Sequence, residues 1–238
     1  MKKRVTILSL ASLVMLMLFA GCAGKTVFQS NFGASMVGQP PSQTQTVGTA
    51  NVFGDQGSVV VASIPDVTGT WVEIGRTPTQ HGQPPSQLAI FQGNFVQSAG
   101  AGTYYFSTFL YIPSDSNNVA TLQFDQFGWP VADVTGGFLH IDFLLDNRVR
   151  IDDNANTIFG TFPRNQVFIV QVTLNVNPVA STAHIVLSGA GASGEADYTI
   201  IPALQQKALQ FGAVKVWMGF PWTGKFDASQ IVVTYNAP

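Results

Sequence analysis

The sequence predicts an all-β protein, a two-sheet antiparallel jelly-roll sandwich with at most one short helix. Hydrophobic and polar residues alternate over many short stretches, and Gly, Pro, Asn or Asp bounds each stretch. No window of helical length shows a convincing helical period. Only 10% of the residues are charged, so few pairs of opposite charge are available to stabilise helices.

The clearest alternation occurs in residues 138–146 and predicts a strand with one hydrophobic face. The hydrophobic face carries Leu139, Ile141, Phe143 and Leu145. The polar face carries His140, Asp142 and Asp146. A turn at Asn147 leads to strands at 148–151, 157–162 and 167–176, so a meander of neighbouring antiparallel strands is the simplest arrangement.

The remaining strands are short and follow one another closely. We expect them, in chain order, at residues 27–32, 58–64, 70–75, 87–92, 103–112, 119–124, 182–188, 196–200, 214–220 and 230–235. Residues 33–50, rich in Gly, Pro, Gln, Ser and Thr, predict a long loop within the fold. Residues 202–210 are the best helix candidate, because Pro202 suits a first turn and helix-forming residues follow.

The N-terminus predicts a targeting segment. Basic residues at positions 2–4 precede a hydrophobic run over 5–20. The stretch Leu18-Phe19-Ala20-Gly21-Cys22 then resembles the lipobox of bacterial lipoproteins, with Phe19 where the usual pattern has Leu. This resemblance implies that residues 1–21 form a signal peptide that is removed and that Cys22 is lipidated. The alternative is a plain secretory signal followed by an accidental cysteine.

The domain organisation follows from that anchor. Residues 22–26 form a short tether, and residues 27–238 form a single β-sandwich domain held close to the membrane. Cys22 is the only cysteine, so no internal disulfide can form, and several acyl chains on it would hold firmly. Ala23 follows rather than Asp, which by resemblance to the sorting of enterobacterial lipoproteins favours the outer membrane of the cell envelope.

The charge balance excludes one class of partner. The chain has 11 Lys and Arg residues against 13 Asp and Glu residues, and the basic residues at 2–4 lie in the expected signal peptide. The mature chain is therefore mildly acidic. Nucleic acid is not an expected partner, because binding phosphates requires a concentrated basic surface.

Several strands together resemble one known superfamily. The opening stretch 27–32, the strands at 69–74 and 104–112, and the closing stretch 226–235 are similar to the concanavalin A-like lectin and glucanase superfamily, which includes LamG-like jelly rolls. The resemblance implies two curved antiparallel sheets, with a concave face that carries the sugar site or active site in relatives. Fold resemblance alone does not assign function.

The glycosidase motif of that superfamily is missing. Retaining enzymes of this kind carry Glu-x-Asp-x-x-Glu on one strand, because cleavage needs two carboxyl groups close together. The comparable strand, 140–146, contains no glutamate, and Glu73 and Glu195 are the only glutamates in the chain. The motifs of alginate-lyase relatives are also absent. We therefore predict a non-catalytic protein.

A polar patch is expected on the concave sheet. His140 and Asp142 share one strand face, and Arg148 and Arg150 follow on the adjacent strand. Such a group can bind ligand hydroxyls. The alternative is an ordinary ladder of salt bridges and hydrogen bonds on a solvated sheet.

Tryptophans are the candidates for stacking on a sugar ring, since indole faces pack against the apolar faces of pyranoses. The candidates are Trp129, Trp217 and Trp222. Trp217 shares its strand face with Lys215, opposite hydrophobic residues, which predicts exposure of that face.

A calcium site is a weaker hypothesis. The hard oxygen ligands that calcium prefers cluster at Asp152, Asp153, Asn154 and Asn156. The same residues make an ordinary hairpin turn. No other cofactor is expected.

These observations favour a lipid-anchored cell-envelope protein with a non-catalytic domain that binds carbohydrate. The first alternative is a structural or accessory subunit docked on an envelope protein complex, which a short tether would suit. The second alternative is a divergent polysaccharide hydrolase or lyase.

Overall fold

The structure, a computed structural model, describes residues 24–33, 36–75, 88–153, 155–219 and 224–238. Its strands are β1 (Lys25–Gln29), β2 (Thr49–Phe53), β3 (Val59–Ala62), β4 (Trp71–Ile74), β5 (Ala89–Asn94), β6 (Gly102–Tyr111), β7 (Ala120–Gln126), β8 (Gly137–Phe143), β9 (Arg148–Ile151), β10 (Ile158–Thr161), β11 (Val167–Val176), β12 (Thr182–Ser188), β13 (Ser193–Thr199), β14 (Phe211–Met218) and β15 (Phe226–Asn236). The helical elements are η2 (Pro202–Leu204) and α2 (Gln205–Ala208).

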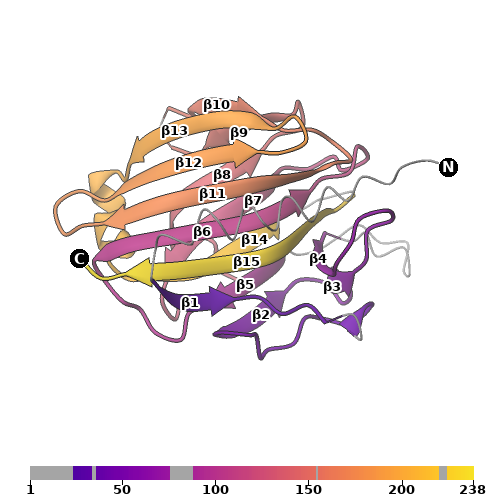
Figure 1. Ribbon diagram of the computed structural model, residues 1–238, viewed down its shortest axis with the longest axis horizontal. Coiled ribbons are helices and arrows are strands. Elements are labelled where there is room, and N and C mark those ends of the chain that lie inside the picture. Colours follow the sequence, from indigo (N-terminus) through magenta and orange to yellow (C-terminus); the bar gives the residue numbers. More distant parts are fainter. Residues whose placement is uncertain (1–23, 34–35, 76–87, 154, 220–223) are drawn as a thin grey trace.

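The strands form one antiparallel sheet that folds over on itself into two layers. Their order is β2-β5-β14-β7-β8-β9-β10-β13-β12-β11-β6-β15-β4-β3, and β1 also pairs with β15. Figure 1 shows β13, β12, β11, β6 and β15 side by side in the nearer layer, with β8, β7, β14 and β5 behind them. The predicted all-β antiparallel sandwich is confirmed. The two layers are joined at one edge, because β10 pairs with both β9 and β13.

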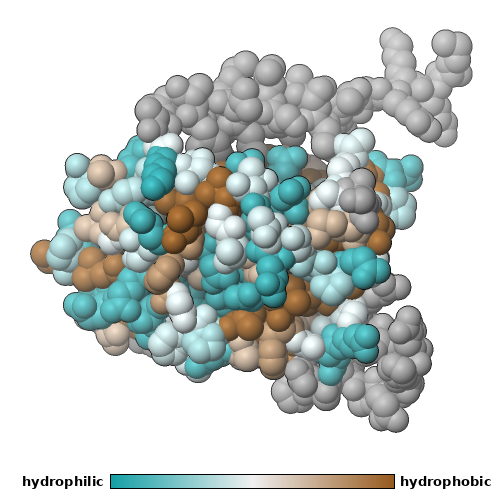
Figure 2. Space-filling view, turned by 90° about the horizontal axis from the view of Figure 1, so that it is seen from below, coloured by the Kyte–Doolittle hydropathy of each residue, from teal (hydrophilic) through white to brown (hydrophobic). Residues whose placement is uncertain are grey.

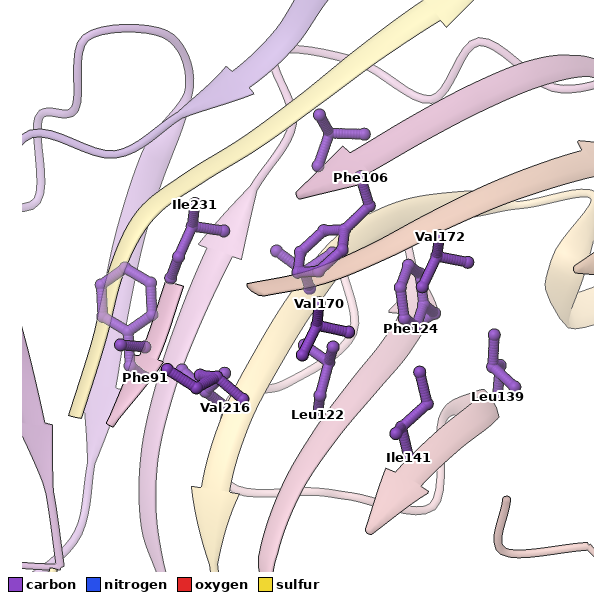
Figure 3. Packing of buried hydrophobic residues seen from close by; sticks show 14 of the residues in the cluster. Phe91, Phe106, Leu122, Phe124, Leu139, Ile141, Val170, Val172, Val216 and Ile231 are labelled. Carbon is purple, nitrogen blue, oxygen red and sulfur yellow. The ribbon is translucent and has the colours of Figure 1, made fainter. Parts of the chain in front are cut away.

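The hydrophobic core fills the space between the layers. Figure 3 shows the side chains that meet there from β7, β8, β6 and β11: Leu122, Phe124, Leu139, Ile141, Phe106, Val170 and Val172. Phe211 of β14 lies inside an aromatic cluster, with ring centroids 4.8 to 5.6 Å from those of Phe95, Tyr104, Phe124 and Phe138. Burial of these large side chains is the main favourable term for folding.

The predicted hairpin around Asn147 is present, but its first strand is shorter than the alternation indicated. β8 ends at Phe143, and Asn147 adopts a left-handed backbone conformation with φ of 67° in the turn to β9. Leu145 was predicted on the hydrophobic face, whereas it is 55% exposed. The chain leaves the strand before Leu145, so alternation no longer determines which side that residue faces.

Two further elements differ from the prediction. β2 was not predicted; it begins at the end of the stretch 33–50 predicted as a loop and pairs with β5 over its whole length. β13 begins at Ser193 rather than near residue 196. The short helix is confirmed as one turn of η2 followed by one turn of α2. Within the described part of the chain, no helix is long and hydrophobic enough to span a membrane.

The surface carries scattered hydrophobic residues. Figure 2 shows brown, hydrophobic residues lying between polar ones on the described part of the face seen from below. The larger exposed hydrophobic side chains of the described residues include Val37, Val52 and Phe127. Such scattered exposure is normal for protein surfaces and indicates no binding site by itself.

Candidate functional site

The rear layer carries polar side chains on its outer side, away from the core. Strand register aligns them in two rows across β5, β14, β7, β8 and β9. The first row is Gln92, Lys215, Gln123 and His140. The second row is Trp217, Thr121, Asp142 and Arg150. We call this surface the polar face.

Asp142 is the fixed centre of the second row. Its Oδ1 accepts a hydrogen bond of 2.7 Å from the Thr121 hydroxyl, and its Oδ2 accepts two from Arg150, at 2.9 Å from Nε and 2.8 Å from Nη2. The Asp142 side chain is 6% exposed, whereas that of Arg150 is 29% exposed. Because the Arg150 guanidinium donates from both Nε and Nη2 to one carboxylate, Asp142 fixes its orientation.

Asp152 joins the two rows at the end of β9. Its Oδ2 lies 3.7 Å from Nδ1 of His140, and its Oδ1 lies 3.8 Å from Nη2 of Arg150. The Asp152 side chain is 45% exposed. Burial lowers the pKa of His140, although the charges of nearby aspartates oppose this shift. The imidazole is therefore neutral at pH 7, and Asp152 remains an accessible acceptor.

A cavity of about 300 Å³ opens beside these residues, and we call it the edge cavity. β10 is short and pairs with β13 only at Ser193 and Gly194. Tyr198, in the second half of β13, lines the cavity. His140, Asp152, Asp153 and Tyr198 supply the polar lining, and Ile151 contributes to the hydrophobic part.

The edge cavity combines the aromatic side chain of Tyr198 with hydrogen-bonding side chains. Burial, together with the charge of Asp153, raises the pKa of Tyr198, so its phenol stays protonated. Asp153 is occupied by its own turn, since its Oδ1 accepts hydrogen bonds from the backbone N–H groups of Ala155 and Thr157. A ligand would therefore meet the Asp152 carboxylate, the Tyr198 hydroxyl and ring, and the His140 imidazole.

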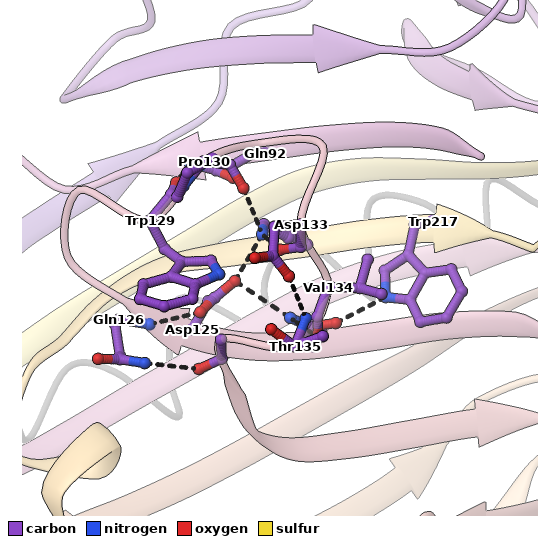
Figure 4. A network of polar contacts seen from close by, with 12 residues as sticks. Gln92, Asp125, Gln126, Trp129, Pro130, Asp133, Val134, Thr135 and Trp217 are labelled. Carbon is purple, nitrogen blue, oxygen red and sulfur yellow. Dashed lines mark hydrogen bonds and ion pairs between the residues drawn. The ribbon is translucent and has the colours of Figure 1, made fainter. Parts of the chain in front are cut away.

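Loop 127–136 covers the other end of the polar face, as Figure 4 shows. Side chains of the sheet donate to its backbone carbonyls: Gln92 to Trp129 at 3.1 Å, Gln123 to Val134 at 3.1 Å, and Lys215 to Pro130 at 3.1 Å and to Asp133 at 2.6 Å. The loop therefore covers the first row at β5, β14 and β7, where Gln92, Lys215 and Gln123 are buried.

Lys215 was predicted to be exposed, and the structure shows that this was wrong. Its side chain is completely buried, and its Nζ lies 2.6 Å from Oδ2 of Asp125, which is also completely buried. A Lys on the outer side of a sheet is normally solvated. Here the loop carbonyls and Asp125 together replace water around the ammonium group.

The tryptophan candidates separate in space. Trp217 is half-buried on the polar face, and its Nε1 donates a 2.9 Å hydrogen bond to Oε1 of Gln123. Trp129 belongs to loop 127–136, and its indole packs so closely on Gly136 that a side chain there would clash with it. Figure 4 shows the two indoles on opposite sides of the network. Both tryptophans are half-buried.

Four of the sequence-predicted site residues share one surface: His140, Asp142, Arg150 and Trp217. Arg148 lies at the hairpin end of β9, 53% exposed, and pairs with Asp146 at 2.6 Å. Trp222, Asn154, the segment 1–21 and Cys22 lie outside the described residues.

The calcium candidates do not converge. Within the described ranges, no three or more His, Cys, Asp or Glu side chains are grouped so that they could hold a metal ion. Asp152 faces His140 and Arg150, whereas Asp153 caps the turn that contains Asn156. The hairpin-turn interpretation accounts for these side chains.

Sequence reasoning missed Tyr198. Its strand was predicted, but nothing near it in the sequence marks it as functional, because its partners come from residues 137–153. It also missed the Lys215–Asp125 pair, whose members are far apart in the chain. Only a prediction of strand order across the whole sheet would have shown either one.

The strand order and two-layer arrangement define a concanavalin A-like lectin fold. No protein-family model matches the sequence, and no curated protein matches it in sequence. The Ca²⁺-bound exoplasmic/lumenal domain of VIP36 is similar in structure, with a TM-score of 0.50 and 10% identity, and 90% of each chain is covered. Its Ca²⁺/Man3GlcNAc-bound form also has a TM-score of 0.50, over 79% of this chain and 84% of that chain.

A sialidase is also similar, with a TM-score of 0.52 and 9% identity over 77% of this chain. The present chain covers only 16% of the sialidase chain. At these identities the likenesses show a shared fold and do not assign an activity.

Proposed function

We propose that this protein is a lipid-anchored protein of the cell envelope whose β-sandwich binds a glycan in the edge cavity without cleaving it. The observation that carries the proposal is the edge cavity itself, where the ring of Tyr198 and the carboxylate of Asp152 line one hollow of about 300 Å³. Sugars present apolar ring faces and hydroxyl groups together, and a cavity of this composition matches both.

The polar face extends the site beyond the edge cavity. Arg150 and Trp217 lie in one row across neighbouring strands β9, β8, β7 and β14. With neighbouring strands about 4.8 Å apart, the row spans roughly 14 Å. An oligosaccharide chain with one residue in the edge cavity would have room to contact Arg150 and then Trp217.

Two considerations favour binding over cleavage. The strand comparable to the catalytic strand of glucanases carries His140 and Asp142 but no glutamate. Both carboxylate oxygens of Asp142 are already engaged by Thr121 and Arg150, so neither is placed to transfer a proton to a substrate. The Man3GlcNAc named for VIP36 makes a mannose-containing oligosaccharide a reasonable first ligand to test.

A glycan array with the purified protein tests the proposal. We expect specific binding to a limited set of glycans, followed by a measured Kd for the best one. Asp152→Asn should weaken that binding about 10-fold or more, because hydrogen bonds to a charged acceptor contribute roughly 1.5 to 3 kcal/mol. Asp197→Asn is the matched control, since Asp197 is 90% exposed and pairs with His184 on another surface.

The array also separates the alternatives. Equal Kd values for the Asp152 and Asp197 variants would refute the edge cavity as the site. Shortened glycan products after incubation would instead support the divergent hydrolase or lyase. No glycan binding, together with an envelope protein that co-purifies reproducibly, would support the accessory subunit.

A further inference from the structure

The charged side chains that line the edge cavity are all acidic. They are Asp152 and Asp153, and no Lys or Arg lines the cavity among the residues that the structure describes. Burial lowers the pKa of His140, so its imidazole brings no positive charge to the lining at pH 7. Lys207 of α2 donates instead to the backbone carbonyl of Thr135. A ligand in the edge cavity therefore meets negative charge that no lining cation balances.

Arg150, which lies near Asp152, does not neutralise this charge. Its Nε and Nη2 both donate to Asp142, at 2.9 and 2.8 Å. The distance from Nη2 to Oδ1 of Asp152 is 3.8 Å, which is too long for a hydrogen bond. The single guanidinium is thus shared by two carboxylates, Asp142 and Asp152, and Asp142 holds it. The Asp152 side chain, 45% exposed, keeps an accessible acceptor for a cation.

The aromatic side chain adds a second attraction for a cation. Tyr198 lines the cavity, and the charge of Asp153 contributes to the raised pKa of its phenol, so these two side chains interact. The face of a tyrosine ring attracts an ammonium group that lies within about 6 Å of its centroid. The ring and the carboxylates therefore favour the same kind of ligand group, a protonated amine.

We propose that the edge cavity selects a glycan that carries a free amino sugar, that is, a hexose with an unacetylated, protonated amino group. This assignment rests on the proposed glycan-binding function and names the sugar for that site. The ammonium group donates to Asp152, and the apolar face of the sugar ring packs on Tyr198. N-acetylation replaces the ammonium group by a neutral amide, and a uronic acid adds a carboxylate beside Asp152 and Asp153. Both changes weaken binding.

Three tetramers of β-1,4-linked sugars test this preference, because they differ only at carbon 2. The glucosamine tetramer has an amino group there, the N-acetylglucosamine tetramer an acetamido group, and the glucose tetramer a hydroxyl group. Their Kd values for the full-length chain in detergent are measured by calorimetry at about pH 6, where amines are protonated and aspartates ionised. We expect the glucosamine tetramer to bind about 5-fold or more tightly than the other two, because hydrogen bonds between charged groups are the stronger ones.

Three variants locate the preference in the edge cavity. Asp152→Asn keeps the shape of the side chain and removes its charge, so most of the preference for the glucosamine tetramer should disappear. Asp152→Glu keeps the charge and should keep the preference. Asp197→Asn is the matched control, because it removes one exposed carboxylate from another surface and should leave the preference unchanged.

The inference would be overturned by equal Kd values for the three tetramers, by tighter binding of a neutral one, or by no binding of the glucosamine tetramer. It would also be overturned if Asp152→Asn kept the preference, or if Asp197→Asn lost it to the same extent, because the preference would then follow the overall charge of the chain. The proposed function would survive these results if another glycan on the array bound and Asp152→Asn weakened that binding. Absence of binding to every glycan would reject both.

Discussion

Asp227 is an ionisable residue that the fold removes from water. It is completely buried on β15, and neither carboxylate oxygen has a hydrogen-bond partner among the described residues. Burial raises its pKa from 3.8 to about 7, Lys225 lowers it, and the facing carboxylate of Glu73 raises it. Lys225 itself lies against Glu73. The protonated form of Asp227 is therefore favoured by the fold.

The stability of the protein should fall as pH rises through this range. Below about pH 4, Asp227 is protonated in both folded and unfolded chains. Between about pH 4 and pH 7 only the unfolded chain loses the proton, so the free energy of unfolding decreases by up to about 4 kcal/mol. Asp227→Asn should remove most of this decrease, as measured by urea unfolding at several pH values.

Asp66→Asn is the control for this experiment, because Asp66 is exposed. The free energy of unfolding of Asp66→Asn should depend on pH in the same way as that of the unsubstituted protein. If the free energy of unfolding of the Asp227→Asn protein decreases with pH as much as that of the unsubstituted protein, another group is responsible for the decrease.

At the scale of elements, the buried ion pair between Lys215 and Asp125 holds loop 127–136 on the sheet. Lys215→Met removes the cation and two contacts to the loop carbonyls, and it leaves Asp125 buried without a counterion. We expect a loss of about 3 to 5 kcal/mol in the free energy of unfolding. Amide hydrogens of the loop should also exchange faster.

The double variant Lys215→Met/Asp125→Leu tests the cause. Replacing both charges with hydrophobic side chains removes the unpaired carboxylate, so most of the lost stability should return. A Lys215→Met protein within about 1 kcal/mol of the unsubstituted one would show that the ion pair does not hold the loop.

The sequence predicted most strands because alternation marks a surface with one hydrophobic side. It did so best for β9, β11 and β12, whose predicted ranges match the observed strands. β2 was missed because only Ala50 is buried in it, so its five residues show no alternation. β2 and β5 are some forty residues apart in the chain, so the alternation within either strand cannot predict that they pair.

The candidate site was only partly predictable for a related reason. His140, Asp142 and Arg150 lie on one hairpin, so alternation and a single turn are enough to place them together. Tyr198 and Asp152 are far apart in the chain and line one cavity. Lys215 becomes buried because loop 127–136 folds back over it. Both outcomes depend on how distant strands fit together.

At the scale of the whole molecule, we propose that a glycan-binding β-sandwich is attached to the membrane by a lipid anchor. The anchor rests on the resemblance of the stretch ending at Cys22 to a lipobox. We expect mass spectrometry of the mature protein to find an acylated cysteine at its N-terminus. Cys22→Ser should prevent maturation and lipidation, so the mature lipid-modified form should disappear from the membrane fraction.

An unmodified N-terminus at another residue would reject the anchor. The glycan-binding proposal would stand unaffected, because the described residues that line the edge cavity all lie within 137–204.

The most direct test of the central claim is a crystal structure of the protein with its best glycan bound. We predict one sugar ring against Tyr198, with hydroxyl groups hydrogen-bonded to Asp152 and the next residue directed toward Arg150. A glycan seated elsewhere, with the edge cavity empty, would contradict the account.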